Sequence, residues 1–346
     1  TAAHSYIHLE YYIIHDDEIG QLFSECLIQK AQEGVEISLL YDGMGCLKTH
    51  SAYFKKLENA GIKIICFAPP FKPFINLRFN YRNHRKLCTI DDKIAYLGGF
   101  NVGDEYLGKN KKMGYWRDTH LKIEGSGAIL ANLQFLLDWR FASHETHLLE
   151  HYKIPQLTPL CYSTGAVVQL VSGGPDSKHS SILNGYIGMI AGARKSIWIQ
   201  TPYFIPNEAL LTTLKIAALS GLDVRIMFPN KPDHAFVYWA TYSYIGELID
   251  CGARAYTYDK GFLHSKTIIV DEALSSVGTA NFDMRSFKLN FEMNAFIYDK
   301  NFAKKLSQAF IHDLEDSSEL TLERYNNRSR LIRFKESVSR LFSPIL

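Results

Sequence analysis

A pattern of three polar residues occurs twice in this chain with identical internal spacing. Each copy has a histidine, a lysine two positions later and an aspartate five positions after the lysine: His84, Lys86 and Asp91, then His264, Lys266 and Asp271. An asparagine follows each copy after a glycine-containing turn, at Asn101 and Asn281. The histidines and the asparagines are both 180 residues apart (264 − 84 and 281 − 101). Two copies in register predict a duplicated chain with one site built from both halves.

The sequence around the two copies predicts the same alternation of strands and helices. Segments rich in β-branched and aromatic residues alternate with helical patterns in the first half, with strands at 6–14, 34–42 and 62–67 and helices at 16–32 and 51–59. The second half repeats this order, with strands at 196–204, 221–229 and 254–258 and helices at 207–220 and 236–250. Such alternation is typical of parallel α/β sheets. We therefore expect a duplicated α/β fold, in which two α/β/α halves with mixed, mainly parallel sheets are related by a pseudo-twofold axis.

The two halves are expected to join in the stretch 142–180, which contains scattered proline, serine and glycine residues. We place the N-terminal half at 1–160 and the C-terminal half at 161–346. The second half is expected to end in a basic amphipathic helix.

The overall composition does not identify a partner, but it limits the class of protein. The formal charge of the 346 residues is only +2, so any basic patch must be local. Six scattered cysteines without a C-x-x-C pair argue against a disulfide framework or structural zinc and fit a reducing compartment. The sequence contains no run of about 18 apolar residues, so it predicts no transmembrane helix. Because the chain opens on Thr1 in place of Met, we expect a fragment of a longer protein.

The paired motifs have the residues for phosphoryl-transfer chemistry. Side chains at i and i+2 of a strand share a face, so each histidine points the same way as its lysine. Facing strands would bring together two imidazoles, the ammonium groups of Lys86 and Lys266, and the amides of Asn101 and Asn281. These donors can hold the oxygens of a phosphate without a metal or other cofactor. One histidine can then attack phosphorus while the other protonates the leaving alcohol.

A nucleophilic histidine needs an acceptor for its second ring nitrogen. The candidates are Asp118 and Glu292, each of which opens a strand-like segment after the asparagine turn. Because one histidine must be neutral while the other is protonated, we expect a bell-shaped dependence of the rate on pH, centred near neutrality.

The chain resembles the phospholipase D superfamily, and most closely its bacterial cardiolipin synthases. The resemblance lies in the segments NYRNHRKLCTIDDKIAYLGGFNVGDEYLG, YWRDTHLKIEG, SGGPDS, GFLHSKTIIVD and LFSPIL. It implies that each acid holds the histidine of the opposite half, with His84 as the nucleophile and His264 as the acid and base. It also implies that Asp91 and Asp271 support the site more than they react.

The resemblance further implies the substrate and its location. Cardiolipin synthases move a phosphatidyl group from one phosphatidylglycerol to another and release glycerol. We therefore expect anionic phospholipid and a membrane surface as partners, with no nucleic acid. The expected location is the cytoplasmic side of the inner membrane, although the hydrophobic N-terminal helices usual in the family are absent here. The oligomeric state stays open.

Two flanking segments fit a lipid partner. Residues 67–79 contain four phenylalanines and three prolines, and residues 318–346 have six basic and three acidic side chains. Six apolar residues of the latter segment fall on one helical face: Leu331, Phe334, Val338, Leu341, Phe342 and Ile345. Both segments could contact a bilayer, or could instead pack on the protein itself.

Three alternatives to the transferase remain open. The same site could use water and release phosphatidic acid as a phospholipase D, or could cleave nucleic acid. A nuclease would be expected to have a longer basic track with stacking aromatic residues. The third alternative is a membrane-binding module without activity, which the two intact motifs disfavour.

Overall fold

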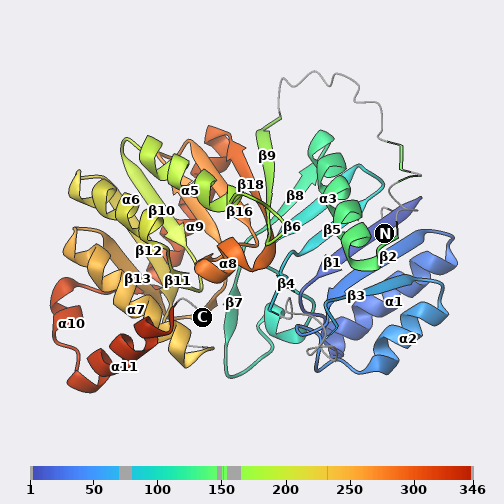
Figure 1. Cartoon of the computed structure of the whole chain (residues 1–346), viewed down its shortest axis with the longest axis horizontal. Coiled ribbons are helices and arrows are strands. Elements are labelled where there is room, and N and C mark those ends of the chain that lie inside the picture. The colour runs from blue at the N-terminus through green and yellow to red at the C-terminus, as the bar shows by residue number, and fades with distance from the viewer. Residues whose placement is uncertain are drawn as a thin grey trace.

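The molecule consists of two α/β halves that lie side by side (Figure 1). The structure is a computed structural model, and it describes residues 3–69, 80–145, 150, 152–153, 165–231 and 233–343. The predicted boundary at residue 160 and most of the loop 67–79 lie outside the described residues. The division into 1–160 and 161–346 therefore stays a prediction.

The N-terminal half is built around a mixed six-stranded sheet. Its strands lie in the order β3 (Lys63–Phe67), β2 (Glu36–Asp42), β1 (Tyr6–Tyr11), β5 (Leu87–Ile90), β6 (Ile94–Gly98) and β8 (His120–Glu124). β1, β2 and β3 are parallel, whereas β5, β6 and β8 continue the sheet with antiparallel pairs.

The C-terminal half repeats this plan in a larger sheet. The strands lie in the order β19 (Ser317–Glu319), β13 (Arg254–Tyr258), β12 (Asp223–Pro229), β10 (Ser196–Gln200), β15 (Thr267–Val270), β16 (Leu274–Gly278), β18 (Asn290–Tyr298) and β4 (Arg82–Asn83), and β9 (Val167–Gly173) also pairs with β18. β10, β12 and β13 are parallel, and β15, β16 and β18 add antiparallel pairs. The predicted α/β class, the mixed sheets and the duplication are thus confirmed.

The sheets are mixed as predicted, but the prediction that parallel pairs predominate is wrong. Parallel pairing is concentrated in the strands joined by helices, whereas the motif strands form hairpins. The hairpin turns contain consecutive residues with positive φ, Asp91–Asp92 and Asp271–Glu272. Turns this short join antiparallel strands, because a parallel pair needs a long crossover.

The helices start where the sequence supplies capping side chains. Asp17 accepts the Gly20 N–H at 3.0 Å at the start of α1, and Asn207 does the same for Leu210 at the start of α6. The helices are α1 (Glu18–Gln32), α2 (Ser51–Asn59), α3 (Ser126–Ser143), α5 (Ser181–Gly192), α6 (Glu208–Leu219), α7 (Ala235–Asp250), α8 (Met284–Lys288), α9 (Lys300–Glu315), α10 (Leu322–Asn326) and α11 (Arg330–Leu341), with a 3-10 turn at Asp104–Leu107. In the part of the chain that the structure describes, no helix has both the length and the apolar character needed to cross a membrane.

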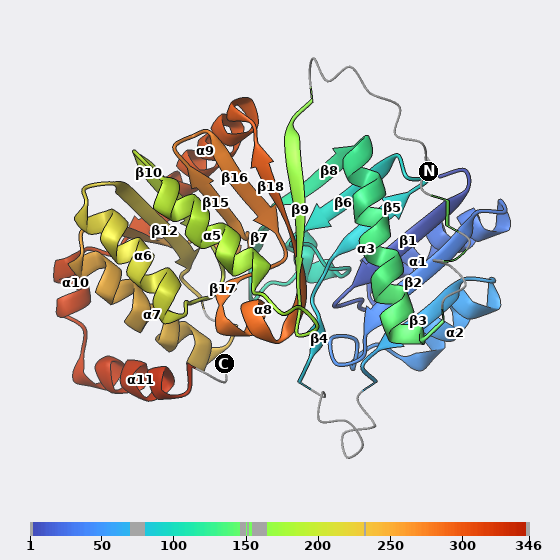
Figure 2. The same cartoon turned by 45° about the horizontal axis from the view of Figure 1, so that its top comes forward.

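The three larger apolar clusters of the described residues hold these layers together. One lies between the N-terminal sheet and α1 and α2, and another between the C-terminal sheet and α5, α6 and α7. The third is shared by both halves, because Phe135 of α3 and Phe310 of α9 belong to one cluster with residues of both sheets. Figure 2 shows α3 lying across the strands of the N-terminal sheet. The shared core fixes one half against the other.

Two short parallel strand pairs cross between the halves. β4 (Arg82–Asn83) pairs with the start of β18, and β14 (Gly261–Leu263) pairs with β7 (Tyr115–Arg117). A further short pair, β11 (Phe204–Ile205) with β17 (Phe282–Asp283), lies within the second half. Each crossing strand ends just before a motif histidine, so the crossings set the positions of both histidines.

The motif aspartates lie at the hairpin turns and bind backbone. Asp91 accepts the N–H groups of His4, Ser5 and Tyr6 at 2.7, 2.9 and 2.8 Å. Asp271 binds the corresponding backbone at the start of β10, from residues 194–196, at 2.7 to 2.9 Å. Burial opposes ionisation of both carboxyl groups, but the backbone N–H groups outweigh it and lower each pKa. Both aspartates thus fasten the first strand of their half. That they support the site more than they react stays a prediction.

The predicted C-terminal helix corresponds to α11, which ends at Leu341, before the last two residues of the predicted apolar face. Residues 318–346 also contain the end of β19 and the short helix α10. The break between α10 and α11 occurs because Ser329 caps a new helix by accepting the Ile332 N–H at 3.3 Å. Ile345 lies outside the described residues.

We predict that Gly261→Ala weakens the crossing between β14 and β7. A Cβ at this position would lie 1.9 Å from the carbonyl oxygen of Tyr115, so the paired backbones must separate. We expect the free energy of unfolding to fall by about 1–3 kcal/mol, measured by urea denaturation. Gly188→Ala in α5 is the matched control, since its Cβ would meet no atom within 4 Å and alanine favours a helix. Equal stability of the two variants would contradict the prediction.

We predict that Asp91→Ala lowers the free energy of unfolding by about 1–3 kcal/mol at pH 7, because three backbone donors lose a charged acceptor. The folded-state pKa is below the usual 3.8, so the stabilisation is present above that pH and is lost as the pH falls through the folded value. Urea denaturation at several pH values measures it. A variant with native stability but no turnover would instead assign Asp91 to the chemistry.

Candidate active site

A cavity of about 670 Å³ opens between the two halves at the ends of the crossing strands. Both motif histidines and both motif asparagines line it: His84, His264, Asn101 and Asn281. The crossing pairs bring the histidines here, since the His84 N–H donates to the Phe291 carbonyl at 3.0 Å and the His264 N–H to the Arg117 carbonyl at 2.8 Å. The two histidines are thus held in equivalent ways by opposite halves.

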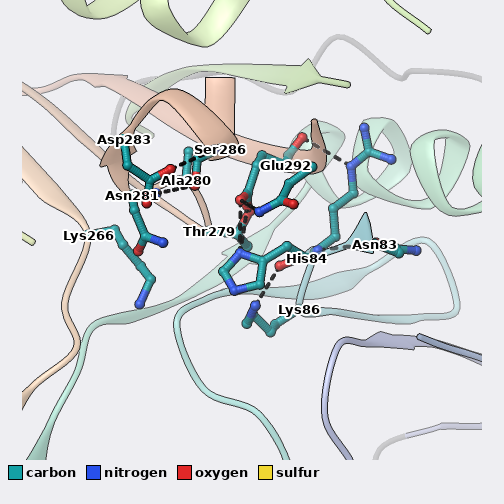
Figure 3. Close-up of polar contacts among 12 residues, drawn as sticks. Asn83, His84, Lys86, Lys266, Thr279, Ala280, Asn281, Asp283, Ser286 and Glu292 are labelled. Carbon is teal, nitrogen blue, oxygen red and sulfur yellow. Dashed lines mark hydrogen bonds and ion pairs between the residues drawn. The ribbon is translucent and has the colours of Figure 1, made fainter. Parts of the chain in front are cut away.

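The residue after each acceptor carbonyl is the acid that binds the histidine ring. Glu292 follows Phe291, and its two oxygens lie 2.9 and 3.0 Å from His84 Nδ1 (Figure 3). Asp118 follows Arg117, and its Oδ2 lies 2.7 Å from His264 Nδ1. In each pair the acid occupies Nδ1, which leaves Nε2 as the ring nitrogen for chemistry.

Both acids are buried and held by further donors. Thr279 donates its hydroxyl to Glu292 Oε2 at 2.5 Å, as Figure 3 shows, so Thr279 supports the acid and not a phosphate. Asp118 accepts the Trp116 indole N–H at 3.3 Å and its neighbour's N–H at 2.8 Å. Gly99 provides the space for Asp118, since a Cβ there would lie 2.0 Å from Asp118 Oδ1. These contacts fix the orientation of the acids.

The site favours the neutral form of both histidines. Burial lowers the pKa of His84 to about 4, and the charge of Glu292 only partly opposes it. Burial and the Lys266 charge lower the pKa of His264 to about 4 against the effect of Asp118. At neutral pH both rings are therefore neutral, which suits a nucleophile. A bound phosphate anion would raise the pKa of the ring that serves as the acid.

The two lysines lie at equivalent places beneath the histidines. Lys86 Nζ donates to the His84 carbonyl at 2.6 Å, and Lys266 Nζ to the His264 carbonyl at 2.5 Å. Both side chains are buried. Burial lowers the pKa of Lys86 well below its usual value and that of Lys266 to about 8. Each ammonium has three N–H groups, so both retain donors for a ligand.

The two asparagines differ in how far their side chains are engaged. Asn101 accepts the Ile13 N–H and donates to the Tyr106 hydroxyl, both at 3.1 Å. Asn281 donates its backbone N–H to Ser286 at 3.2 Å, and its buried Oδ1 has no hydrogen-bond partner among the described residues. Both line the cavity, and their predicted phosphate-binding role stays a prediction.

The structure adds residues that the sequence analysis missed. Asp283 lines the cavity beside Asn281, and burial raises its pKa to about 6 although it accepts the Ser286 N–H at 2.6 Å (Figure 3). Tyr203 donates to Asp233 on the same wall. In the sequence, only the position of Asp283 two residues after Asn281 could have indicated that it belongs to the site. No pattern in the sequence indicates Tyr203 or Asp233. The described residues contain no cluster of His, Cys, Asp and Glu side chains that could hold a metal ion.

The chain matches known proteins over its whole length. The family model described as "Cardiolipin synthase, PLD-like domain" matches residues 1–121 and 186–314. The "Major cardiolipin synthase ClsA" of Bacillus subtilis is 55% identical over 347 residues, which covers 100% of this chain and 71% of that protein. A "Cardiolipin synthase" of Listeria welshimeri is 52% identical and covers 99% of this chain and 71% of its own length.

Solved structures with lower sequence identity share the fold. Phosphatidylserine synthase of Haemophilus influenzae superposes with a TM-score of 0.73 at 16% identity, covering 99% of this chain and 89% of that one. Polyphosphate kinase of Porphyromonas gingivalis has a TM-score of 0.61 at 12% identity and covers 99% of this chain and 50% of its own. The family that the sequence predicts is confirmed by the matches at 52–55% identity: the chain belongs to the cardiolipin synthase family of phospholipase D-like proteins.

Proposed function

We propose that this chain makes cardiolipin and glycerol from two molecules of phosphatidylglycerol, through an intermediate in which His84 bears the phosphatidyl group. Its family membership establishes the class of activity, phosphatidyl transfer. The observation that carries the mechanism is the pair of histidine–carboxylate contacts that open into one cavity.

The proposed reaction has two steps in which atoms and charges balance. When the phosphate of the first phosphatidylglycerol is bound, His264 Nε2 takes a proton from solvent. His84 Nε2 attacks phosphorus, and the bond to the glycerol oxygen breaks as His264 gives that oxygen its proton. Glycerol leaves. His264 then takes the proton from a terminal hydroxyl of the second phosphatidylglycerol, whose oxygen attacks phosphorus and displaces His84. The product is cardiolipin, and both histidines return to their starting state.

The charges around the cavity support this division between the histidines. Arg82 and Arg285 line the cavity together with Tyr12, whose ring contacts that of His84 edge-on at 5.0 Å between centroids. Glu105 also lines the cavity, and its bond to His15 lowers the pKa of its carboxyl group. The basic side suits a phosphate, whereas carboxylates beside His264 can accept hydrogen bonds from the hydroxyls of glycerol.

The buried lysines provide donors for a proposed cage around the substrate phosphate. Lys86 and Lys266 have ammonium donors left after binding the histidine carbonyls, and the negative charge of a phosphate would offset their mutual repulsion. Such preorganised donors stabilise charge that develops on the phosphoryl oxygens. Asn101 and Asn281 complete the proposed cage from opposite halves.

The proposed partners are anionic phospholipid and the membrane surface, with the cytoplasmic side of the inner membrane as the location. The family of the chain and the two buried lysines that contact the motif histidines support this choice. A hydrolase that releases phosphatidic acid would use the same first step, with water in place of the second lipid. The product distinguishes the two.

We predict that His84→Ala and His264→Ala each lower kcat at least about 100-fold, because each removes a group that transfers a proton or bonds to phosphorus. The assay mixes the protein with phosphatidylglycerol in detergent micelles and identifies the lipids by mass spectrometry. His264→Ala should slow both steps, because His264 protonates the leaving glycerol and deprotonates the second hydroxyl; a phosphatidyl adduct on His84 is read from the intact mass. His312→Ala, an exposed position on α9, is the control and should retain activity.

The products decide between the proposed function and its alternatives. Cardiolipin with free glycerol supports the transferase, and phosphatidic acid alone assigns the hydrolase. Unchanged lipid with all proteins would reject lipid turnover and direct the test to other phosphodiesters. An adduct on His264 in the His84→Ala variant would reverse the roles of the two histidines.

We predict that kcat/KM for phosphatidylglycerol falls above about pH 8. Burial lowers the pKa of Lys266 to about 8, so its positive charge is present below that pH and is lost above it, where the phosphate loses a donor. Activity also falls as the pH approaches 4, where His84 gains a proton. Lys266→Arg should move the alkaline limb upward even if the maximum rate is lower. If the alkaline limb does not move in this variant, a group other than Lys266 is responsible for it. The control is Lys260→Gln, at an exposed lysine that forms an ion pair.

A further inference from the structure

Helix α11 presents its apolar side to solvent. Leu331, Phe334 and Leu341 are 62%, 66% and 79% exposed, whereas Glu336 and Ser339 on the opposite side are 3% and 1% exposed. A surface helix of a globular protein normally buries its apolar stripe against the core. The stripe of α11 is therefore available for another partner.

Polar contacts hold the helix in this orientation. Arg328 binds both oxygens of the buried Glu336 at 2.7 and 2.9 Å, and Arg340 forms an ion pair with Glu247 of α7. The ring of Phe342 meets that of Phe236, at the start of α7, at 6.4 Å between centroids. α11 is thus fastened to α7 by its polar side, and its apolar side continues into the start of α7.

The apolar surface extends to the mouth of the active-site cavity. Phe236 is 55% exposed and is followed by Val237, which lines the cavity. In the other half, Leu47 and Leu107 are 53% and 60% exposed, and each is the sequence neighbour of a residue that lines the cavity. Three separate segments therefore have an exposed apolar side chain next in sequence to a residue that lines the cavity. Figure 1 shows α11 beside α7, on the same side of the molecule as β7.

The charge of α11 identifies the partner. The helix has four basic residues and one acidic residue, Arg330, Arg333, Lys335, Arg340 and Glu336. Its single acid is paired with Arg328, and Arg340 is paired with Glu247, so the exposed charges of the helix are those of Arg330, Arg333 and Lys335. Positive charge beside an exposed apolar stripe is typical of helices that lie in the interface of an anionic bilayer.

We propose that α11 and the apolar rim, formed by Leu47, Leu107 and Phe236, dock the protein on an anionic phospholipid bilayer with the cavity mouth against the lipid. The apolar side chains enter the interface, and Arg330, Arg333 and Lys335 meet the headgroups. A lipid can then reach the histidines without leaving the bilayer completely. The choice of phosphatidylglycerol as the lipid rests on the proposed function, whereas docking itself does not require turnover.

The test measures binding of the full chain to vesicles by co-sedimentation. Vesicles contain equal parts of phosphatidylglycerol and phosphatidylcholine, or phosphatidylcholine alone. We expect the wild-type protein to prefer the anionic vesicles, with a preference that weakens as salt increases. The double variant Phe334→Ser/Leu341→Ser should bind at least about tenfold more weakly, because two large apolar groups no longer enter the interface. Both positions are exposed, so the fold should remain intact.

The matched control is Ile216→Ser/Leu219→Ser on α6, where two apolar side chains are 60% and 70% exposed but lie outside the proposed surface. Its vesicle binding should stay within about twofold of wild type. All three proteins should turn over water-soluble dihexanoyl phosphatidylglycerol equally, while the α11 variant alone loses turnover of vesicle lipid.

Each outcome bears on one proposal. Unchanged vesicle binding by the α11 variant, or no binding by the wild type, overturns the docking surface. Self-association of the wild type that the α11 variant abolishes would also overturn it and assign the stripe to a second copy of the chain. Vesicle binding through α11 without turnover of either lipid form would preserve the docking surface and reject the proposed function.

Discussion

The crossed strand pairs are the constraint on which the site depends. β4 runs beside β18 and β14 beside β7, so each motif histidine follows a strand that is paired with the opposite half. The pairing bonds the backbone of His84 to Phe291 and that of His264 to Arg117, and the next residue of each partner is the acid. Neither half alone contains a complete histidine–acid pair. The shared apolar core between the sheets keeps the crossings in register.

The same arrangement explains how four charged groups can be buried together. Lys86, Lys266, Asp118 and Glu292 would each be costly to bury alone. Burial by itself raises the pKa of both acids, yet the histidine and lysine charges around them keep each pKa below its usual value. Burial lowers the pKa of both lysines, so their positive charges are the least stabilised of the four. A phosphate anion bound between them, as proposed, would offset the cost of burying both positive charges.

The sequence was sufficient for features that depend on local period or on repetition. The helix at 51–59 and the cap at Asp17 follow from neighbouring residues, and duplication follows from the spacing of His84 and His264. The aspartates of the motifs could not be placed in the same way, because their carboxylates bind backbone that is 85 to 87 residues distant for Asp91. Contacts of this kind come from tertiary pairing, which a spacing pattern does not contain. The family resemblance supplied the cross-half acids.

The orientation of α11 shows a different limit. Its amphipathic period is visible in the sequence, but the period is the same whether the apolar side faces the protein or the solvent. What decides the orientation is the set of partners on the polar side, above all Arg328 with Glu336 and Arg340 with Glu247. Arg328 offsets the cost of burying Glu336, whereas the pair between Arg340 and Glu247 is more exposed. A helix held this way keeps its apolar stripe free, at the side of α7 whose first turn borders the cavity. The fold thereby links the active-site mouth to a surface suited to lipid.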